Sequence, residues 1–263
     1  MPGPPPPPAA VLLPLCPLYS PEEYMSATTE SLATSIEHDG FAVVEAVVPA
    51  AVVDALLPAL ADVDHEGAIQ RRGSVHAVRN LLEAVPQVQA LARSEAIRNL
   101  VVPVLGSGCF VVRGILFDKT PEANWKVAWH QDLTIAARER REAPGFGPWS
   151  EKASIPHVQP PAHVLERMLT VRVHLDDCGP ENGPVQVLPG SHRQGRLSAA
   201  EITRWRENCE PVPCTSIRGG VLLMRPLILH ASSPATVPGH RRVIHLEFSA
   251  DDLPHGLEWH GRW

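Results

Sequence analysis

The segment Asn182-Gly183-Pro184-Val185-Gln186-Val187-Leu188-Pro189-Gly190-Ser191 places a short β-type run between two turn signals. Val and Leu favour strands, the Asn-Gly pair accepts the positive φ angles of a tight turn, and Pro-Gly ends a strand. We therefore predict a strand from Pro184 to Leu188, with a hairpin turn at Asn182-Gly183 that joins it to the strand before.

The same alternation of short β-type runs and turns continues through the chain beyond Gly108. Short runs of β-branched and apolar residues alternate with Gly and Pro turns, which is typical of a mainly β barrel or jelly roll. The further strands predicted in this way run from Phe110 to Asp118, Leu169 to Asp176, Gly220 to Leu229 and Arg241 to Phe248.

Helices dominate the first hundred residues. Apolar residues recur at helical spacing from Pro21 to His38, behind a Pro and two acids that suit a helix start. Two further helices are expected from Pro49 to Val63 and from Pro86 to Val104, with a Val-rich strand from Phe41 to Val48 between the first two.

Residues 1–20 contain a proline run from Pro4 to Pro8 and lack the features of a signal peptide or membrane span. We interpret them as a Pro-rich mobile arm. Residues 21–263 are expected to form a single domain, because barrels and sandwiches of this size enclose one core.

Composition excludes some classes of partner. A net charge of -6 and a pI near 6.1 leave no basic stripe of the kind that nucleic acid requires. Five scattered cysteines suit reduced thiols and a cytoplasmic protein. Cys209 and Cys214 lack the second Cys or His pair that a structural zinc site needs, so we expect no metal there.

The stretch from Leu133 to Met168 shows no strand pattern and is rich in Pro and Gly. Long insertions within a compact domain usually carry function. We interpret residues 133–168 as a lid or substrate-recognition insertion, with His157, Gln159 and His163 as possible substrate contacts.

The tripeptide His130-Gln131-Asp132 is a candidate metal motif. Side chains at i and i+2 of a strand share a face, so His130 and Asp132 can reach one cation, and His230 can supply a third ligand from a distant strand. Two His and one carboxylate leave open positions, as in non-haem Fe(II) oxygenases, although a zinc site has similar ligands. With 13 His in the chain the motif also recurs, as His174-Leu175-Asp176.

Arg241 favours the oxygenase. An oxygenase must hold the remote carboxylate of an acidic cosubstrate, and a guanidinium does this with a planar fork. Strand alternation puts Arg241, Val243, His245 and Glu247 on one face, which resembles a polar barrel interior, and makes Arg242 the weaker candidate. Ser232 lies two residues after His230 and can add a hydroxyl to the same carboxylate.

At this point the chain resembles the phytanoyl-CoA dioxygenase family of Fe(II)/2-oxoglutarate-dependent oxygenases. The resemblance spans most of residues 30 to 250. The matching motifs are Trp129-His130-Gln131-Asp132-Leu133, Asn182-Gly183 through Val187-Leu188-Pro189-Gly190-Ser191-His192, His230-Ala231-Ser232, Arg241, and Asp39-Gly40-Phe41 before a Val-rich run.

The resemblance implies a double-stranded β-helix, a cupin-like jelly roll with N-terminal helices. It also implies Fe(II) held by His130, Asp132 and His230, with 2-oxoglutarate and O2 as cosubstrates and Arg241 and Ser232 on the far carboxylate. The implied activity is hydroxylation of a C–H bond with release of succinate and CO2, since related halogenases lack the carboxylate.

Other residues have smaller expected roles. The resemblance gives His174 a structural role. Arg172 replaces an aromatic or apolar residue, so it is expected to contact 2-oxoglutarate or a substrate acid, or to form a structural salt bridge. His245 is expected to support the site rather than bind the metal. Lys119 and Lys126 can contact cosubstrate or substrate, although we expect them to be solvated loop lysines.

Two rival classes remain open on the sequence. One is a metal-dependent hydrolase or isomerase on a cupin-like barrel, and the other is a barrel that binds metal and ligand without turnover. The expected partner is a small molecule of unknown identity. No nucleic acid, membrane or obligate protein partner is expected.

Overall fold

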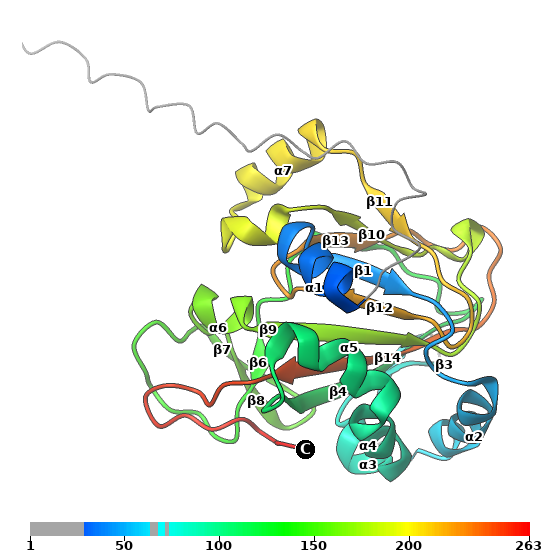
Figure 1. Ribbon diagram of the computed structural model, residues 1–263, viewed down its shortest axis with the longest axis horizontal. Helices are drawn as coiled ribbons and strands as arrows, with labels where there is room; N and C mark the ends of the chain where they lie inside the picture. The colour runs from blue at the N-terminus through cyan, green and yellow to red at the C-terminus, as the bar shows by residue number, and fades with distance from the viewer. Residues whose placement is uncertain (1–28, 64–67, 72–73) are drawn as a thin grey trace, which may run out of the picture.

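The computed structural model describes residues 29–63, 68–71 and 74–263 (Figure 1). The Pro-rich arm expected over residues 1–20 lies outside the described residues. So does the first part of the helix expected from Pro21, and the remainder forms α1 (Thr29–His38). The single domain expected over residues 21–263 stays a prediction.

Two antiparallel sheets face each other and dominate the chain (Figure 1). The seven-stranded sheet has the order β1 (Phe41–Val44), β12 (Val221–Met224), β9 (Met168–His174), β14 (Arg241–Ser249), β4 (Phe110–Lys119), β3 (Ser74–Val78) and β2 (Ala68–Arg71). The four-stranded sheet has the order β11 (Val212–Cys214), β10 (Val185–Leu188), β13 (Leu229–Ser232) and β5 (Val127–His130). The expectation of a mainly β protein is confirmed.

Helices cover the outer face of the large sheet, while α7 (Ala199–Asn208) lies beyond the small one (Figure 1). Ile244 and Leu246 of β14 are fully buried in one apolar cluster with Ile97 and Val101. Burial of each such side chain contributes roughly 1.5–3 kcal/mol. The covering helices are α1, α2 (Ala50–Ala61), α3 (Leu81–Ala84), α4 (Pro86–Arg93) and α5 (Glu95–Leu105).

The alternate residues of β14 face the small sheet, because successive side chains of a strand point to opposite faces. Arg241 pairs with Lys119 of β4 at one end of the strand, and Glu247 pairs with Arg113 at the other. His245 lies between them and pairs with Arg172 of β9. Over about 20 Å the inner face of the large sheet therefore carries polar and charged side chains, with Val243, Phe117 and Ile115 between them.

The helix predicted from Pro86 to Val104 is wrong as one element, because it is two helices that meet at Ser94. Ser94 has extended backbone angles (φ -63, ψ 152), and its hydroxyl accepts a hydrogen bond from Ile97 N. The same hydroxyl donates to Leu91 O at 2.7 Å. A serine that bonds the backbone in this way ends one helix and caps the next.

A predicted strand and a predicted hairpin turn are also wrong. The strand predicted from Gly220 to Leu229 is split between β12 and β13, which belong to different sheets. Pro226, which has no N–H, lies in the turn between them, where Ile228 N donates to Arg225 O. Asn182-Gly183 is not a hairpin turn either, because it connects β9 of one sheet to β10 of the other. Gly183 alone of the pair has a positive φ, 63°, and a Cβ there would lie 2.3 Å from Ser233 O.

The expectation that residues 133–168 lack strands is wrong. They contain a three-stranded sheet and a short helix: β6 (Ile135–Ala136), β7 (Trp149–Lys152), β8 (Ile155–Val158) and α6 (Ala162–Glu166). Ile135, Val158 and Leu165 are buried in a cluster that also contains Trp259 near the C-terminus. The strands are too short for a clear periodic pattern, and tertiary packing orders them.

The other predicted elements agree with the structure apart from their ends, whereas α3, α7, β2, β3 and β11 were not predicted. Among the described residues, no helix combines the length and apolar character needed to cross a membrane.

We expect Ser94→Ala to lower the free energy of unfolding by ~1 kcal/mol, because the start of α5 loses its cap. Thr203→Ala on the exposed face of α7 is the matched control. The Thr203 hydroxyl only donates to Ala199 O within its own helix, so this change should stay within about 0.5 kcal/mol. Urea denaturation measures both, and equal stability of the two variants would contradict the capping role.

Candidate metal centre

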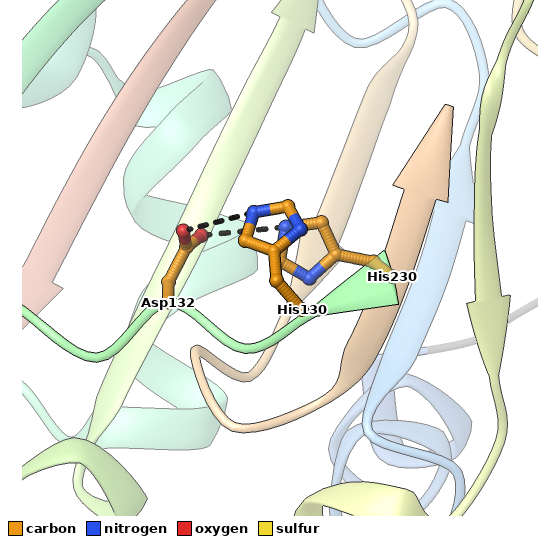
Figure 2. A group of neighbouring side chains, drawn as sticks. All are labelled: His130, Asp132 and His230. Atoms are coloured by element: carbon orange, nitrogen blue, oxygen red, sulfur yellow. Dashed lines mark ion pairs between the residues drawn. The ribbon is translucent and has the colours of Figure 1, made fainter. Parts of the chain in front are cut away.

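His130 and His230 face each other across two paired strands. The register of β5 and β13 pairs the two residues directly. Their ring centroids lie 4.2 Å apart with a tilt of 48°. Figure 2 shows the two imidazoles and the Asp132 carboxylate pointing toward one another. Residues one hundred positions apart thus meet because the small sheet joins their strands.

Asp132 completes the group from just beyond the end of β5, not from within the strand as expected. Its two carboxylate oxygens lie 3.7 Å from His130 Nε2 and 3.6 Å from His230 Nε2. One ligand atom from each of the three residues lies within 4.8 Å of the others, and the described part of the chain holds no second group of this kind. The expected convergence of the three side chains is present.

The backbone sets the orientation of both imidazoles. His130 Nδ1 lies 2.8 Å from Ala128 O, and His230 Nδ1 lies 2.9 Å from Ile228 O. Because a carbonyl oxygen accepts, each Nδ1 carries the proton and each Nε2 keeps a lone pair directed at Asp132. A metal ligand of this type needs that arrangement.

The charge states also suit a metal. Burial lowers the pKa of His230 to about 4, so its imidazole is neutral at neutral pH. Burial alone would raise the pKa of Asp132, but Arg113 and the imidazoles of His230 and His245, which are protonated at low pH, hold it well below its usual range. A neutral imidazole at His230 and an ionised carboxylate at Asp132 are protonation states that bind a divalent cation. The donor set therefore fits the expected Fe(II), and it equally fits zinc.

Gln131 has a structural role that sequence reasoning missed. Its amide nitrogen donates to Gly195 O at 2.8 Å and to Leu227 O at 2.7 Å, and its oxygen accepts from Leu197 N at 2.8 Å. These bonds tie the metal motif to two loops. Strand alternation alone indicated that Gln131 points away from His130 and Asp132.

Cations line the pocket beside the metal triad. Arg241 is buried, and its guanidinium donates to Gly183 O. Arg172 is buried as well, and its guanidinium lies 2.8 Å from His245 Nδ1 and over the ring of Phe117. Both residues line one pocket with His130, Asp132, His230 and Ser232. The structure thus brings together all six site residues that were expected from the sequence.

Lys119 corrects an expectation. It is not a solvated loop lysine: it is 2% exposed, lines the same pocket, and donates to Ser232 Oγ at 3.1 Å and Ser233 O at 2.7 Å. Burial, together with the charges of Arg241 and Arg172, lowers the pKa of Lys119 to about 7. The signal that could have revealed it is the alternation of β4, which puts Lys119 opposite Arg241.

The other candidates lie as follows. His245 contacts Arg172 and Glu247 and is not part of the metal group, as expected. His174 is buried away from the triad, and Arg242 pairs with Asp176 on the outer face. Residues 130, 132 and 230 are thus the metal candidates, and His174 and Asp176 lie outside the metal group. Lys126 and His163 are exposed, His157 lines a different pocket, and Cys209 and Cys214 belong to separate apolar clusters.

Comparison with known proteins gives a consistent result. The family model described as phytanoyl-CoA dioxygenase (PhyH) matches residues 36–243. The curated "Ectoine dioxygenase" of Bordetella bronchiseptica is 26% identical over 196 residues, which are 71% of this chain and 57% of that protein. The chain thus matches little more than half the length of this relative.

Two solved structures share the fold. One is the non-heme alpha ketoglutarate dependent carbocyclase SnoK from nogalamycin biosynthesis, with a TM-score of 0.66, 17% identity and coverage of 86% of this chain and 87% of that one. The other is EctD from S. alaskensis with 2-oxoglutarate and 5-hydroxyectoine, with a TM-score of 0.65, 19% identity and coverage of 90% and 83%. These likenesses confirm the jelly-roll fold.

We expect His130→Ala and His230→Ala each to weaken Fe(II) binding by more than about 100-fold, since even residues that only orient a ligand contribute about 10- to 100-fold. The matched control is His163→Ala, on the exposed face of α6. Anaerobic calorimetry with Fe(II) measures the affinity. Wild-type affinity in either triad variant would rule out the site.

Proposed function

This chain belongs to the phytanoyl-CoA dioxygenase (PhyH) family, and we propose on that premise that it is a non-haem Fe(II)- and 2-oxoglutarate-dependent dioxygenase. The proposed reaction hydroxylates a C–H bond of a small molecule and releases succinate and CO2. The observation that carries the proposal is the His130, Asp132 and His230 triad beside a pocket lined by buried cations.

The proposed iron ligands are the Nε2 atoms of His130 and His230 and the carboxylate of Asp132. Bound Fe(II) supplies the oxidative chemistry, in which O2 is reduced while 2-oxoglutarate loses CO2 and the substrate C–H bond is oxidised. Three protein ligands leave positions for 2-oxoglutarate and O2. The chain's own contribution is to hold the two imidazoles in the Nδ1–H form and to fix their angle through the backbone bonds.

The proposed anchor for 2-oxoglutarate is the cationic end of the pocket. Lys119, Arg172 and Arg241 line it, and among the described lining residues Asp132 is the carboxylate. Asp132 is assigned to the metal, so the cations have no counter-charge. Buried charges without a partner are costly, and a dicarboxylate that reaches from the metal toward Arg241 offsets that cost.

Ser232 and Lys119 act together in this proposal. The Ser232 hydroxyl already accepts from the Lys119 ammonium at 3.1 Å, so its own proton is available to a carboxylate. Arg241 offers a second donor, because its Nε is buried with no hydrogen-bond partner in the described structure. Arg172 keeps its charge at neutral pH, although burial and Arg241 lower its pKa to about 10. It is positioned to meet 2-oxoglutarate or the substrate.

Residues 133–168 are proposed to cover the substrate side of the metal. They begin directly after Asp132, and their buried side chains attach them to the C-terminal segment. A wall of this kind excludes bulk water and positions the substrate. The partner is proposed to be a small molecule. A cytoplasmic location is inferred from the free buried thiols of Cys109, Cys178 and Cys214.

A metal-dependent hydrolase is the second candidate, because the ligand set is compatible with zinc. It gives no role to the three cations that face the pocket next to the metal. We therefore favour the oxygenase.

Succinate formation distinguishes the two. The full chain with Fe(II), ascorbate and 2-oxoglutarate should release succinate even without its primary substrate, at a slow uncoupled rate, and should bind 2-oxoglutarate anaerobically in a metal-dependent way. A hydrolase should do neither, and the absence of both would reject the oxygenase.

We expect Arg241→Gln to weaken binding of 2-oxoglutarate by about 10- to 100-fold, the value of one to two charge-assisted hydrogen bonds. Arg242→Gln is the matched control, because the neighbouring side chain faces outward and pairs with Asp176. It should leave that affinity within about twofold. Anaerobic calorimetry measures both, and equal losses would show that a general effect on the strand is responsible.

The affinity for 2-oxoglutarate should also depend on pH. In the empty pocket Lys119 loses its proton above a pKa of about 7, whereas a bound carboxylate favours the charged ammonium. Binding therefore takes up a proton above pH 7, and the affinity should fall by up to about tenfold per pH unit. Lys119→Met should bind more weakly and lose this slope, whereas the exposed Lys126→Gln should retain it. An unchanged slope in Lys119→Met would contradict the assignment.

A further inference from the structure

A second group of cations lies at the opposite end of the inner face of the large sheet. Arg113 of β4 is six positions from Lys119 on the same face, about 20 Å along the strand. Arg79, which follows β3, and Lys152, the last residue of β7, are the other members. We call Arg79, Arg113 and Lys152 the distal cations. They are not used by the proposed chemistry at the metal.

The distal cations are attached to the metal motif through Thr134, two residues after Asp132. Arg113 Nη1 donates to Thr134 O at 3.4 Å, and Lys152 Nζ donates to Thr134 Oγ1 at 2.9 Å. The positive charge of Arg113 helps to lower the pKa of the Asp132 carboxyl. Along the inner face, the metal triad therefore lies between two cationic groups, with Lys119 and Arg241 in its own pocket on one side and the distal cations on the other.

The distal cations carry more positive charge than their surroundings neutralise. Arg113 Nη2 pairs with Glu247 Oε1 at 2.9 Å. The other nearby carboxylate, Glu83, pairs with His260 at 2.8 Å. Burial, and then the charges of Arg113 and Arg79, lower the pKa of Lys152. Asp132 is assigned to the metal and Glu247 pairs with Arg113, so Arg79 and Lys152 have no ion-pair partner among the described residues.

Hydrogen-bonding groups without a partner occur at the same end. Arg113 Nε and Thr170 Oγ1 are buried and have no hydrogen-bond partner in the part of the chain that the structure describes. Thr170 is 1% exposed and stands opposite Glu247 in the register of β9 and β14. Buried polar atoms are rarely left unpaired, so this end lacks a ligand that both donates charge and accepts hydrogen bonds.

A pocket lined by Arg79 and Arg113 lies at this end, and it is separate from the pocket beside the metal triad. His157 of β8 and Ile155 contribute the wall from residues 133–168. Burial lowers the pKa of His157 to about 4, so it adds no charge.

We propose that the primary substrate carries a carboxylate or phosphate group that binds to the distal cations Arg79, Arg113 and Lys152. This inference rests on the proposed function for the identity of the site as a substrate pocket. It adds a substrate class, a small organic acid or phosphate ester, and it assigns Lys152 of residues 133–168 as a specificity-determining residue.

The location restricts the substrate further. His245 and Glu247 are two residues apart on the same face of β14, which corresponds to about 7 Å along the strand. An anion at the level of Glu247 therefore keeps the remainder of a small molecule close to the metal triad. The oxidised carbon is expected to lie only a few bonds from the acidic group.

The test uses pairs of probes that differ in charge. Hexanoate is compared with hexanamide, and hexyl phosphate with hexanol, for binding to the full chain loaded anaerobically with Fe(II) and saturating 2-oxoglutarate. Without O2 there is no turnover, so calorimetry measures binding alone. At least one anion should bind about tenfold more tightly than its neutral analogue, and the stronger anion distinguishes a carboxylate from a phosphate substrate.

The double variant Arg79→Gln and Lys152→Gln should lose that preference, with anion affinity falling by about tenfold or more. Glu247 keeps Arg113 as its partner in this variant, so the buried ion pair is preserved. Arg204→Gln, on the exposed side of α7, is the matched control for a lost positive charge and should retain the preference.

Three results would overturn the inference: equal binding of anions and neutral analogues, an unchanged preference in the double variant, or displacement of the anion by 2-oxoglutarate. The last would place the anion on Lys119 and Arg241. Failure of the proposed function is recognised separately, because 2-oxoglutarate would then not bind although the distal cations still prefer an anion.

Discussion

The alternation of side chains along β14 is the constraint on which the rest of the structure depends. Ile244, Leu246 and Phe248 are buried against the helices on one face. Arg241, His245 and Glu247 consequently face the small sheet, where burial would be costly without partners. A slip of one residue in the pairing of β14 would exchange the two sets and remove both the core and the site. The apolar core and the candidate site therefore both depend on the pairing register of β14.

The small sheet provides the other half of the site through a single cross-strand pair. His130 and His230 are opposite each other in β5 and β13, and each ring is oriented by a carbonyl of its own strand. Gln131 fixes the loop positions on the far side. The metal ligands are thus held by backbone geometry, which makes them ready for a cation before it binds.

Charge changes sign twice along the inner face of the large sheet. Positive groups lie at both ends, and the carboxylate of Asp132 lies between them. Such an arrangement is unfavourable for the empty protein, because each buried cation loses hydration. The anions that we propose at the two ends would offset this cost.

Several particular expectations failed because they depend on contacts between distant segments. Lys119 was expected to be solvated, since nothing near it in the chain shows that Arg241 and Ser232 lie beside it. Residues 133–168 gave no strand pattern, yet packing against Trp259 and its neighbours orders three short strands. The single helix expected from Pro86 is divided at Ser94, whose hydroxyl bonds the backbone of both helices. Whether a serine ends a helix in this way depends on how the two resulting helices, α4 and α5, pack.

The sequence by itself predicted the mainly β fold from local periodicity, and residue type together with family resemblance made His130, Asp132, His230 and Arg241 the candidates. The tertiary structure decided which of the two His-x-Asp motifs meets a third ligand, that Lys119 belongs to the pocket, and that Arg113 and Lys152 form a second cationic end. The physical reason is that burial and charge pairing depend on three-dimensional neighbours, which strand order and register set and which no local pattern encodes.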